Sequence, residues 1–255
     1  FGGDLLRQGV ATSMGVETLQ IPMFGLYGAC STSGEALALA SMSVAAGYGE
    51  RMLAVTSSHF GSAEKEFRFP LGYANQRPLS AHWTVTGSGA FIVGKNRSHV
   101  RITGVTVGKI VDYGLKDSQN MGACMAPAAC DTIIQNLEDF ERKETDYDRI
   151  ITGDLGYVGQ SILFDLMRGK EHDIKINHMD CGMTIFDQNL QDTHAGGSGC
   201  GCAAATLSAY ILPKISRGEW KRVLFVPTGA LMSTVSYNEG ASVPGIAHGI
   251  VLEHC

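Results

Sequence analysis

The chain has 255 residues, of which 44% are hydrophobic and 18% are charged, a composition that excludes a disordered protein. The formal net charge is -5 and there is no basic stripe, which argues against nucleic acid as a partner. No apolar run reaches the length of a membrane span, so we expect no transmembrane segment, and no signal peptide is visible.

The seven cysteines are an odd number with irregular spacing. Cys200 and Cys202 are separated by one residue, which is too close for a structural zinc pair, and no second pair follows. Several cysteines stand among Ala, Gly and Met, as small core residues do. We therefore expect an intracellular protein in a reducing compartment, with no metal and no cofactor.

One cysteine stands at a chemically favourable place. Cys30 lies between an expected apolar strand, 22–29, and an expected helix of small residues that runs to about Tyr48. The dipole and the free N–H groups at the head of a helix favour a thiolate, or an anion docked beside the thiol. Thr32 and Glu35 have the spacing of a capping box. Cys30 is thus a candidate nucleophile or the floor of a binding pocket.

One order of elements occurs twice along the chain. A glycine-rich turn, a helix of small residues, a second glycine and an apolar strand follow one another from Gly28 to Thr56 and again from Gly197 to Val226. Each copy ends in a further apolar strand that opens with glycine, at 87–93 and at 245–252. This repeat indicates two similar halves with a boundary near residues 96–98.

The remaining elements fit an α/β protein. Both small-residue helices, the second at 203–215, lack a polar face, so we expect them to be buried between sheets. The continuous apolar strands are typical of sheets that are covered on both faces. The other expected elements are an extended segment at 99–111, a helix at 126–141 with Pro127 in its first turn, a strand at 147–152, a helix at 159–168, a strand at 173–176, and a surface or pocket-lining excursion at 62–84.

The cysteine at the head of a buried helix, the repeat and the stretch His194–Gly199 resemble the thiolase superfamily. Within it the chain resembles the stage V sporulation protein AD family over essentially its whole length. The stretches that carry this resemblance are Phe24–Thr32, Phe67–Pro70, Gln76–Pro78, Trp83–Ala90, Asp180–Met183 and Gln191–Cys202.

The resemblance implies a five-layer α/β fold built from two βαβαβαββ halves. Residues 1–97 would form the N-terminal thiolase-like half, incomplete at its start, and residues 98–255 the C-terminal half. It also implies a homodimer in which strand 22–29 pairs across a two-fold axis, by analogy with the superfamily.

The family resemblance implies a role in endospore formation. The expected function is non-catalytic binding of dipicolinic acid (pyridine-2,6-dicarboxylate) for its uptake into the developing spore. The expected partners are small membrane proteins of the same operon. The chain would then lie inside the developing spore, peripheral to its inner membrane through those partners.

The alternative is an acyl-thioester condensing enzyme, similar to ketoacyl synthase III or thiolase, with Cys30 as nucleophile. Such enzymes support the cysteine with two helpers, His/His or His/Asn. His194 aligns with the thiolase histidine, or else Asp192 aligns with the condensing-enzyme asparagine. After the strand at 150–152, where condensing enzymes carry a histidine, the chain has Asp154, for which capping a turn is the default role. The terminal cysteine of thiolases is also missing at 227–229, and these losses favour binding over catalysis.

A dicarboxylate needs donors, and the resemblance suggests where they stand. The candidate ligand-binding residues are Cys30, His194, Thr193, Gly197 of the glycine-rich turn, and Arg77, with Arg68 as the alternative arginine. Arginine is the residue type that grips carboxylates with two parallel hydrogen bonds. Trp83, Phe67 and Phe69 are candidates for stacking on a pyridine ring, although core packing is the commoner role of such residues. His82 and His178 have no partner that the sequence makes visible.

Overall fold

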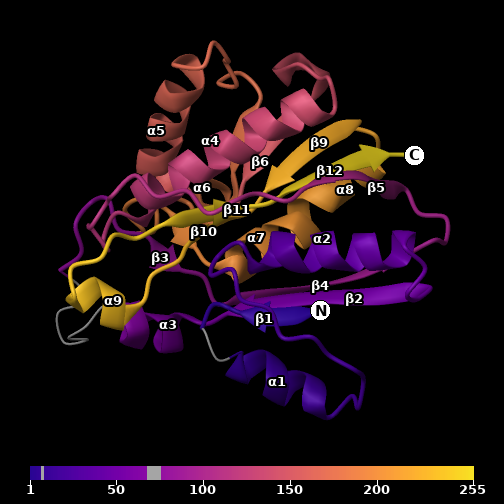
Figure 1. Ribbon diagram of the computed structural model, residues 1–255, viewed down its shortest axis with the longest axis horizontal. Coiled ribbons are helices and arrows are strands. Elements are labelled where there is room, and N and C mark those ends of the chain that lie inside the picture. Colours follow the sequence, from indigo (N-terminus) through magenta and orange to yellow (C-terminus); the bar gives the residue numbers. More distant parts are fainter. Residues whose placement is uncertain (7–8, 68–75) are drawn as a thin grey trace.

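The computed structural model describes residues 1–6, 9–67 and 76–255, and its two larger sheets are separated by helices (Figure 1). The first sheet has the order β1-β2-β4. Its strands are β1 (Gly2–Asp4), β2 (Arg51–Ser58) and β4 (Gly87–Gly94). β1 is parallel to β2, and β4 is antiparallel to β2. The strands expected at 52–56 and 87–93 are therefore confirmed, with slightly longer bounds.

The second sheet has the order β5-β12-β9-β6-β7. Its strands are β5 (Val100–Thr106), β6 (Arg149–Thr152), β7 (His178–Asp180), β9 (Arg222–Val226) and β12 (Gly249–His254). β6 is parallel to β7 and β9, whereas β12 is antiparallel to β9 and β5. The directions of β6, β9 and β12 repeat those of β1, β2 and β4. The division at residues 97 and 98 falls in the connection between β4 and β5, and as a division into halves it stays a prediction.

The middle layer holds the two small-residue helices (Figure 1). They are α2 (Thr32–Ala45) and α7 (Cys200–Thr206), the latter continued by a π turn (Leu207–Ile211) and α8 (Leu212–Ser216). Val223 and Phe225 of β9 pack against this layer, while Leu224 and Val226 face the opposite side. Small side chains allow the two helices and both sheets to approach closely, so burial is confirmed for the first turns of both helices. It is wrong for their later turns, since Met42 is 48% exposed and Tyr210 is 42% exposed.

The outer layers complete a five-layer α-β-α-β-α stack, which is a thiolase-like arrangement (Figure 1). Helices α4 (Met121–Asp139) and α5 (Gly156–Arg168) cover the second sheet, and α1 (Val10–Glu17) lies below the first. The shorter elements are α3 (Phe60–Phe67), β3 (Trp83–Thr84), a 3-10 turn (Glu144–Asp146), α6 (Cys181–Thr184), β8 (Gly197–Ser198), β10 (Thr228–Ala230), α9 (Thr234–Asn238) and β11 (Gly245–Ala247). Among the helices of the described residues, none combines the length and apolar character needed to cross a bilayer.

Two expected elements of the second half are wrong in their bounds. Helix α4 begins before residue 126, because the Asn120 side chain accepts a hydrogen bond from the Ala123 N–H and caps the helix there. Pro127 therefore lies inside the helix and not in its first turn. The strand expected at 245–252 is divided at His248, whose Nδ1 accepts the Gly108 N–H, so that β11 pairs with β10 and β12 pairs with β5 and β9.

Two other expected strands do not form. Residues 173 and 174 are irregular and residues 175 and 176 lie in a turn, since the Asp173 carboxylate accepts the Lys175 N–H. The chain becomes a strand only at His178. Residues 22–29 form isolated bridges and no continuous strand in the described structure. Their recorded backbone pairing is with Gly2, which bonds to Phe24 and Leu26.

Candidate functional site

The backbone places Cys30 immediately before α2. Ala29 has a φ of 51°, an unusual left-handed conformation for a residue with a side chain, and Cys30 is only 4% exposed. The expected capping box is wrong: α2 has no side-chain cap, and the Thr32 hydroxyl instead accepts the Gly28 N–H and donates to the Ala29 carbonyl. The hydroxyl of Thr32 thus holds the turn that positions the thiol.

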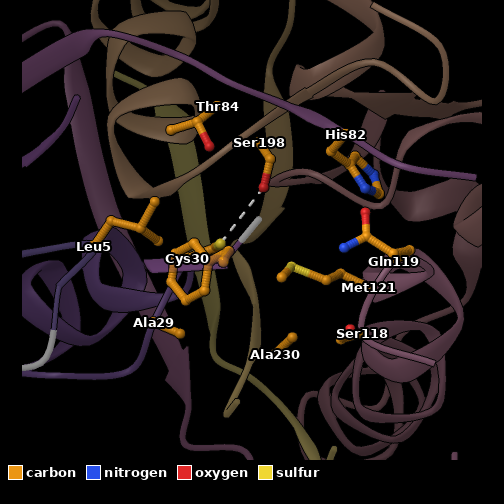
Figure 2. Close-up of a pocket in the computed structure, with 11 residues that line it drawn as sticks. Leu5, Ala29, Cys30, His82, Thr84, Ser118, Gln119, Met121, Ser198 and Ala230 are labelled. Atoms are coloured by element: carbon orange, nitrogen blue, oxygen red, sulfur yellow. Dashed lines mark hydrogen bonds between the residues drawn. The ribbon is translucent and has the colours of Figure 1, made fainter. Parts of the chain in front are cut away.

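The thiol borders a small cavity lined by residues from both sides of the β4–β5 connection (Figure 2). The cavity volume is about 20 Å³, which accommodates about one water molecule. In Figure 2, Cys30 and Ser198 lie on one side and His82, Gln119 and Met121 on the other. The lining residues are Leu5, Ala29, Cys30, Phe67, His82, Thr84, Ser118, Gln119, Met121, Ser198 and Ala230. No lysine or arginine is among them, as far as the described residues show.

Behind the thiol lies a fully buried carboxylate. The Cys30 Sγ is 3.7 Å from the Ser198 Oγ, which in turn donates to Asp154 at 2.9 Å. Asp154 also accepts the Gly199 N–H at 2.8 Å and the Thr228 hydroxyl at 2.9 Å. Asp154, expected to cap its own turn, instead joins segments that follow β6 and β9 and precede α7. Polar partners on every side make burial of this charge tolerable.

This environment keeps Cys30 protonated. Burial raises the pKa of the Cys30 thiol well above its ordinary value, and the nearby Asp154 carboxylate raises it further, against a smaller lowering by the Ser198 hydrogen bond. The N–H groups of Ser31 and Thr32 are already bonded to the carbonyls of Gly28 and Ala29. The expectation that the helix head favours a thiolate is therefore wrong, because desolvation and the carboxylate outweigh the dipole.

Sequence reasoning missed two polar residues of the cavity wall. His82 is buried, and its Nε2 lies 3.1 Å from the Leu155 carbonyl, to which it donates. Gln119 comes from the turn that leads into α4. Neither residue lies in a motif that points to the cavity, since both reach it through tertiary packing. For Asp154, its place at the carboxyl end of a buried strand was a usable signal.

Two of the predicted ligand-binding residues, Arg77 and His194, meet outside this cavity. Asp192 Oδ1 lies 3.0 Å from His194 Nε2, and Asp192 Oδ2 lies 3.6 Å from Arg77 Nη2. Arg77 also donates to the Asp192 carbonyl at 3.1 Å, and its guanidinium lies 4.1 Å from the centre of the Trp83 ring. Neither Arg77 nor His194 lines the cavity beside Cys30.

The other predicted residues have different surroundings. Thr193 is buried, and its Oγ1 has no hydrogen-bond partner among the described residues. Gly197 pairs with Trp83 between β8 and β3, and a Cβ there would come within 2.8 Å of the Ile185 side chain, so Gly197 has a packing role. Trp83 stacks on Phe60, while Phe67 lines the cavity. Arg68 and Phe69 lie outside the described residues.

Comparison with solved structures shows the fold class. The chain superposes with a TM-score of 0.62 and 15% identity on AbyA1, a tetronic acid condensing enzyme, covering 97% of this chain and 74% of that one. For 3-oxoacyl-[acyl-carrier-protein] synthase III from Aquifex aeolicus VF5 the TM-score is 0.57 at 12% identity, and the superposition covers 96% of this chain and 71% of that one. For the Acat5 thiolase from Ascaris suum in complex with coenzyme A the TM-score is 0.59 at 9% identity, and the superposition covers 100% of this chain and 87% of that one. At these identities the likeness shows a thiolase-like fold and nothing about chemistry.

Sequence comparison is more specific. The family described as "Stage V sporulation protein AD (SpoVAD)" matches residues 1–253. Stage V sporulation protein AD of Bacillus subtilis (strain 168) is 43% identical over 251 residues, covering 98% of this chain and 74% of that relative. The resemblance stated from the motifs is thereby confirmed, and the chain belongs to the stage V sporulation protein AD family.

Proposed function

We propose that this chain is a non-catalytic thiolase-fold protein that binds dipicolinate for its uptake into the developing spore. Its membership of a sporulation protein family supports the setting. The chemistry of the site supports the absence of catalysis, and the convergence of Arg77 and His194 supports an anionic ligand.

The observation that carries the non-catalytic part is the group that stands beside the thiol. Condensing enzymes of this fold need donors that stabilise negative charge on the thioester oxygen and on the enolate. Here the position after β6 holds Asp154, an acceptor already bonded to Ser198, Gly199 and Thr228. A carboxylate there opposes the anionic intermediates and also keeps the thiol protonated, so it works against both steps of acyl transfer.

The dicarboxylate is better matched to Arg77 and His194 than to the Cys30 cavity. That cavity holds about one water molecule. The buried Asp154 carboxylate accepts a hydrogen bond from Ser198, which lines the cavity. A dianion placed there would need both a wider cavity and compensation for like-charge repulsion. Arg77 and His194 supply cationic donors instead, and their present partner, Asp192, is itself a carboxylate.

Isothermal titration calorimetry with dipicolinate tests the proposal. We expect saturable binding to the purified chain and weaker binding of pyridine-3,5-dicarboxylate, which has the same charge but a different spacing of the carboxylates. Absence of heat with dipicolinate over a range of temperatures, for protein shown to be folded by circular dichroism, would contradict the ligand assignment.

The retained cysteine makes an acyl-transfer enzyme the second candidate. Incubation with acetyl-CoA and malonyl-CoA, followed by intact-mass and peptide mass spectrometry, separates the two functions. We expect no acyl group on Cys30 and no condensation product. A stable mass increase on Cys30 that disappears in Cys30→Ala would favour the enzyme.

The partners are part of the same proposal. The family resemblance supports action together with small membrane proteins of the sporulation operon. Likeness to the thiolase superfamily supports a homodimer formed through the segment before Cys30. Co-purification of the chain with the co-expressed membrane proteins in detergent would test the first of these associations.

A further inference from the structure

The carboxylate of Asp192 lies against both Arg77 and His194. His194 Nδ1 lies 2.9 Å from the Pro78 carbonyl while its Nε2 lies 3.0 Å from Asp192. Both neighbours of the ring are acceptors, so both hydrogen bonds form only when the ring carries two N–H groups and a positive charge. In that state, an imidazolium and a guanidinium both face the Asp192 carboxylate.

The three side chains differ sharply in exposure. The Arg77 side chain is 4% exposed and that of His194 16%, whereas that of Asp192 is 80% exposed. The cationic donors are therefore fixed in the protein, with Arg77 resting on Trp83. The Asp192 carboxylate lies on the solvent side, where water and salt compete with the two cations for it. Asp192 is the member of the cluster that can leave at small cost.

The Thr193 hydroxyl is a second observation that points to a ligand at this site. Its hydroxyl is buried, and in the described part of the chain nothing bonds to it. A buried hydroxyl without a partner is unfavourable, and such groups in native proteins usually have a role. Thr193 stands between Asp192 and His194 in the chain, so a ligand that reaches His194 arrives beside it.

We propose that Asp192 occupies the place of a ligand carboxylate and is displaced from Arg77 and His194 when a carboxylate ligand binds. The inference rests on the proposed function in that dipicolinate is the ligand used to test it. One carboxylate of the ligand replaces that of Asp192 on the two cations, and the loop that carries Asp192 swings its own carboxylate into water. Asp192 is thus an internal competitor that lowers the affinity of the site.

Calorimetric titration of four variants with dipicolinate tests this displacement. Asp192→Asn removes the competing charge, so we expect binding roughly twofold to fivefold tighter, because water already competes for a carboxylate that is 80% exposed. Arg77→Gln and His194→Gln each remove a cationic donor, and we expect binding at least about tenfold weaker. Asp187→Asn is the matched control, because it removes the same charge from an exposed position on the same loop without touching either cation.

The outcomes separate this inference from the proposed function. If wild-type protein binds dipicolinate and Asp192→Asn binds it no better, or Asp187→Asn improves binding equally, the displacement is wrong while the function stands. If no variant binds dipicolinate, the carboxylate site is tested alone with benzoate. Binding of benzoate is then measured from the change in the NMR signals of the His194 ring. A stronger response in Asp192→Asn than in wild type then supports displacement and removes dipicolinate as the ligand. No response in either variant overturns both. Melting curves show that each variant is folded.

Discussion

At the level of single residues, burial and the Asp154 carboxylate together raise the pKa of Cys30. The carboxylate is linked to the thiol through the Ser198 hydroxyl, and it raises the pKa of a thiol that burial has already raised. A thiolate is the reactive form of cysteine, so the chain holds its cysteine in the unreactive form.

Replacing Asp154 with Asn should therefore activate the thiol. The change removes a charge but keeps a similar shape, so the pKa of Cys30 should fall and its alkylation by iodoacetamide at pH 8 should become at least about tenfold faster. Peptide mass spectrometry measures the rate at Cys30, with the exposed Cys255 as internal reference.

Asp180→Asn is the matched control for this measurement. It also removes a buried carboxylate, but Asp180 has no recorded influence on Cys30. Equal acceleration in both variants would indicate loosening of the fold in place of a charge effect. An unchanged rate in Asp154→Asn would show that burial alone keeps the thiol protonated.

His178 gives the protein an acid-sensitive residue away from the cavity. The Thr152 hydroxyl donates to Asp180, so His178 Nε2 must donate to Thr152 and the ring is neutral, with Nδ1 facing Gln160. Burial lowers the pKa of His178 from 6.5 to about 3, and it raises the pKa of Asp180 from 3.8 to about 6. Below pH 6.5 His178 becomes protonated in the unfolded chain but stays neutral in the folded chain. Asp180 acts in the opposite sense, because the folded chain takes up its proton first.

Stability should therefore depend on His178 between pH 6.5 and pH 3. Between pH 7 and pH 5 the His178 contribution lowers the free energy of unfolding by up to about 2 kcal/mol. In His178→Gln this loss should vanish, leaving the smaller opposing gain from Asp180. Urea denaturation at pH 7 and pH 5 measures the change in the free energy of unfolding. The control is His59→Gln, at an exposed position, which should show the same pH dependence as wild type. The same pH dependence in His178→Gln as in wild type would count against this assignment.

At the level of elements, glycine sets the distance between α4 and α5. A Cβ on Gly159 would lie 2.8 Å from the Gly122 Cα, and one on Gly122 would lie 2.4 Å from the Leu155 carbonyl oxygen. These contacts are between backbones, so no side chain can move aside to make room.

Gly159→Ala should push the two helices apart and destabilise the fold by about 1–3 kcal/mol. Chemical denaturation measures the change. Gly169→Ala, at the end of the same helix, is the control, because its Cβ would meet nothing closer than 3.4 Å and its effect should stay within about 0.5 kcal/mol. Equal effects of both changes would rule out backbone contact as the cause.

The sequence predicts elements well where a local pattern determines them. The apolar strand β9 and the small-residue helix α2 begin and end close to the expected residues. It fails where a single side chain redirects the backbone, as Asn120 does for α4 and His248 does between β11 and β12. Those bonds join or cap segments through contacts that periodicity does not contain.

The site was predictable to a smaller extent. Motif resemblance correctly places Cys30 at the head of a buried helix, and the structure brings Arg77 and His194 to one carboxylate. The link from Cys30 to Asp154 through Ser198 was not predictable, because it depends on three loops meeting behind the cavity. The protonated thiol was not predictable either, since desolvation is a property of the packed interior.

At the level of the whole molecule, apolar side chains gather before Cys30. Leu19, Ile21, Met23 and Phe24 are exposed along a segment that forms no continuous strand in the described structure. Exposed apolar residues in a row are typical of interfaces between protein chains. The proposed homodimer would bury them.

Phe24→Glu should therefore convert a dimer into a monomer. Phe24 is 71% exposed and stacks on Phe1, so the change costs the isolated chain about 1 kcal/mol while placing a charge in the proposed interface. Sedimentation velocity at micromolar concentration measures the assembly state. Ile176→Glu is the control, since that side chain is 91% exposed elsewhere on the molecule. A wild-type protein that sediments as a monomer would contradict the homodimer.

The distribution of thiols has a practical consequence for studying this protein. All seven cysteines fall within the described ranges; six are buried and only Cys255 is exposed. A maleimide fluorophore added to this chain at neutral pH should therefore attach at Cys255 without mutation of the other six cysteines. This chain thus offers a single labelling site for anisotropy or surface-tethering measurements of ligand and partner association.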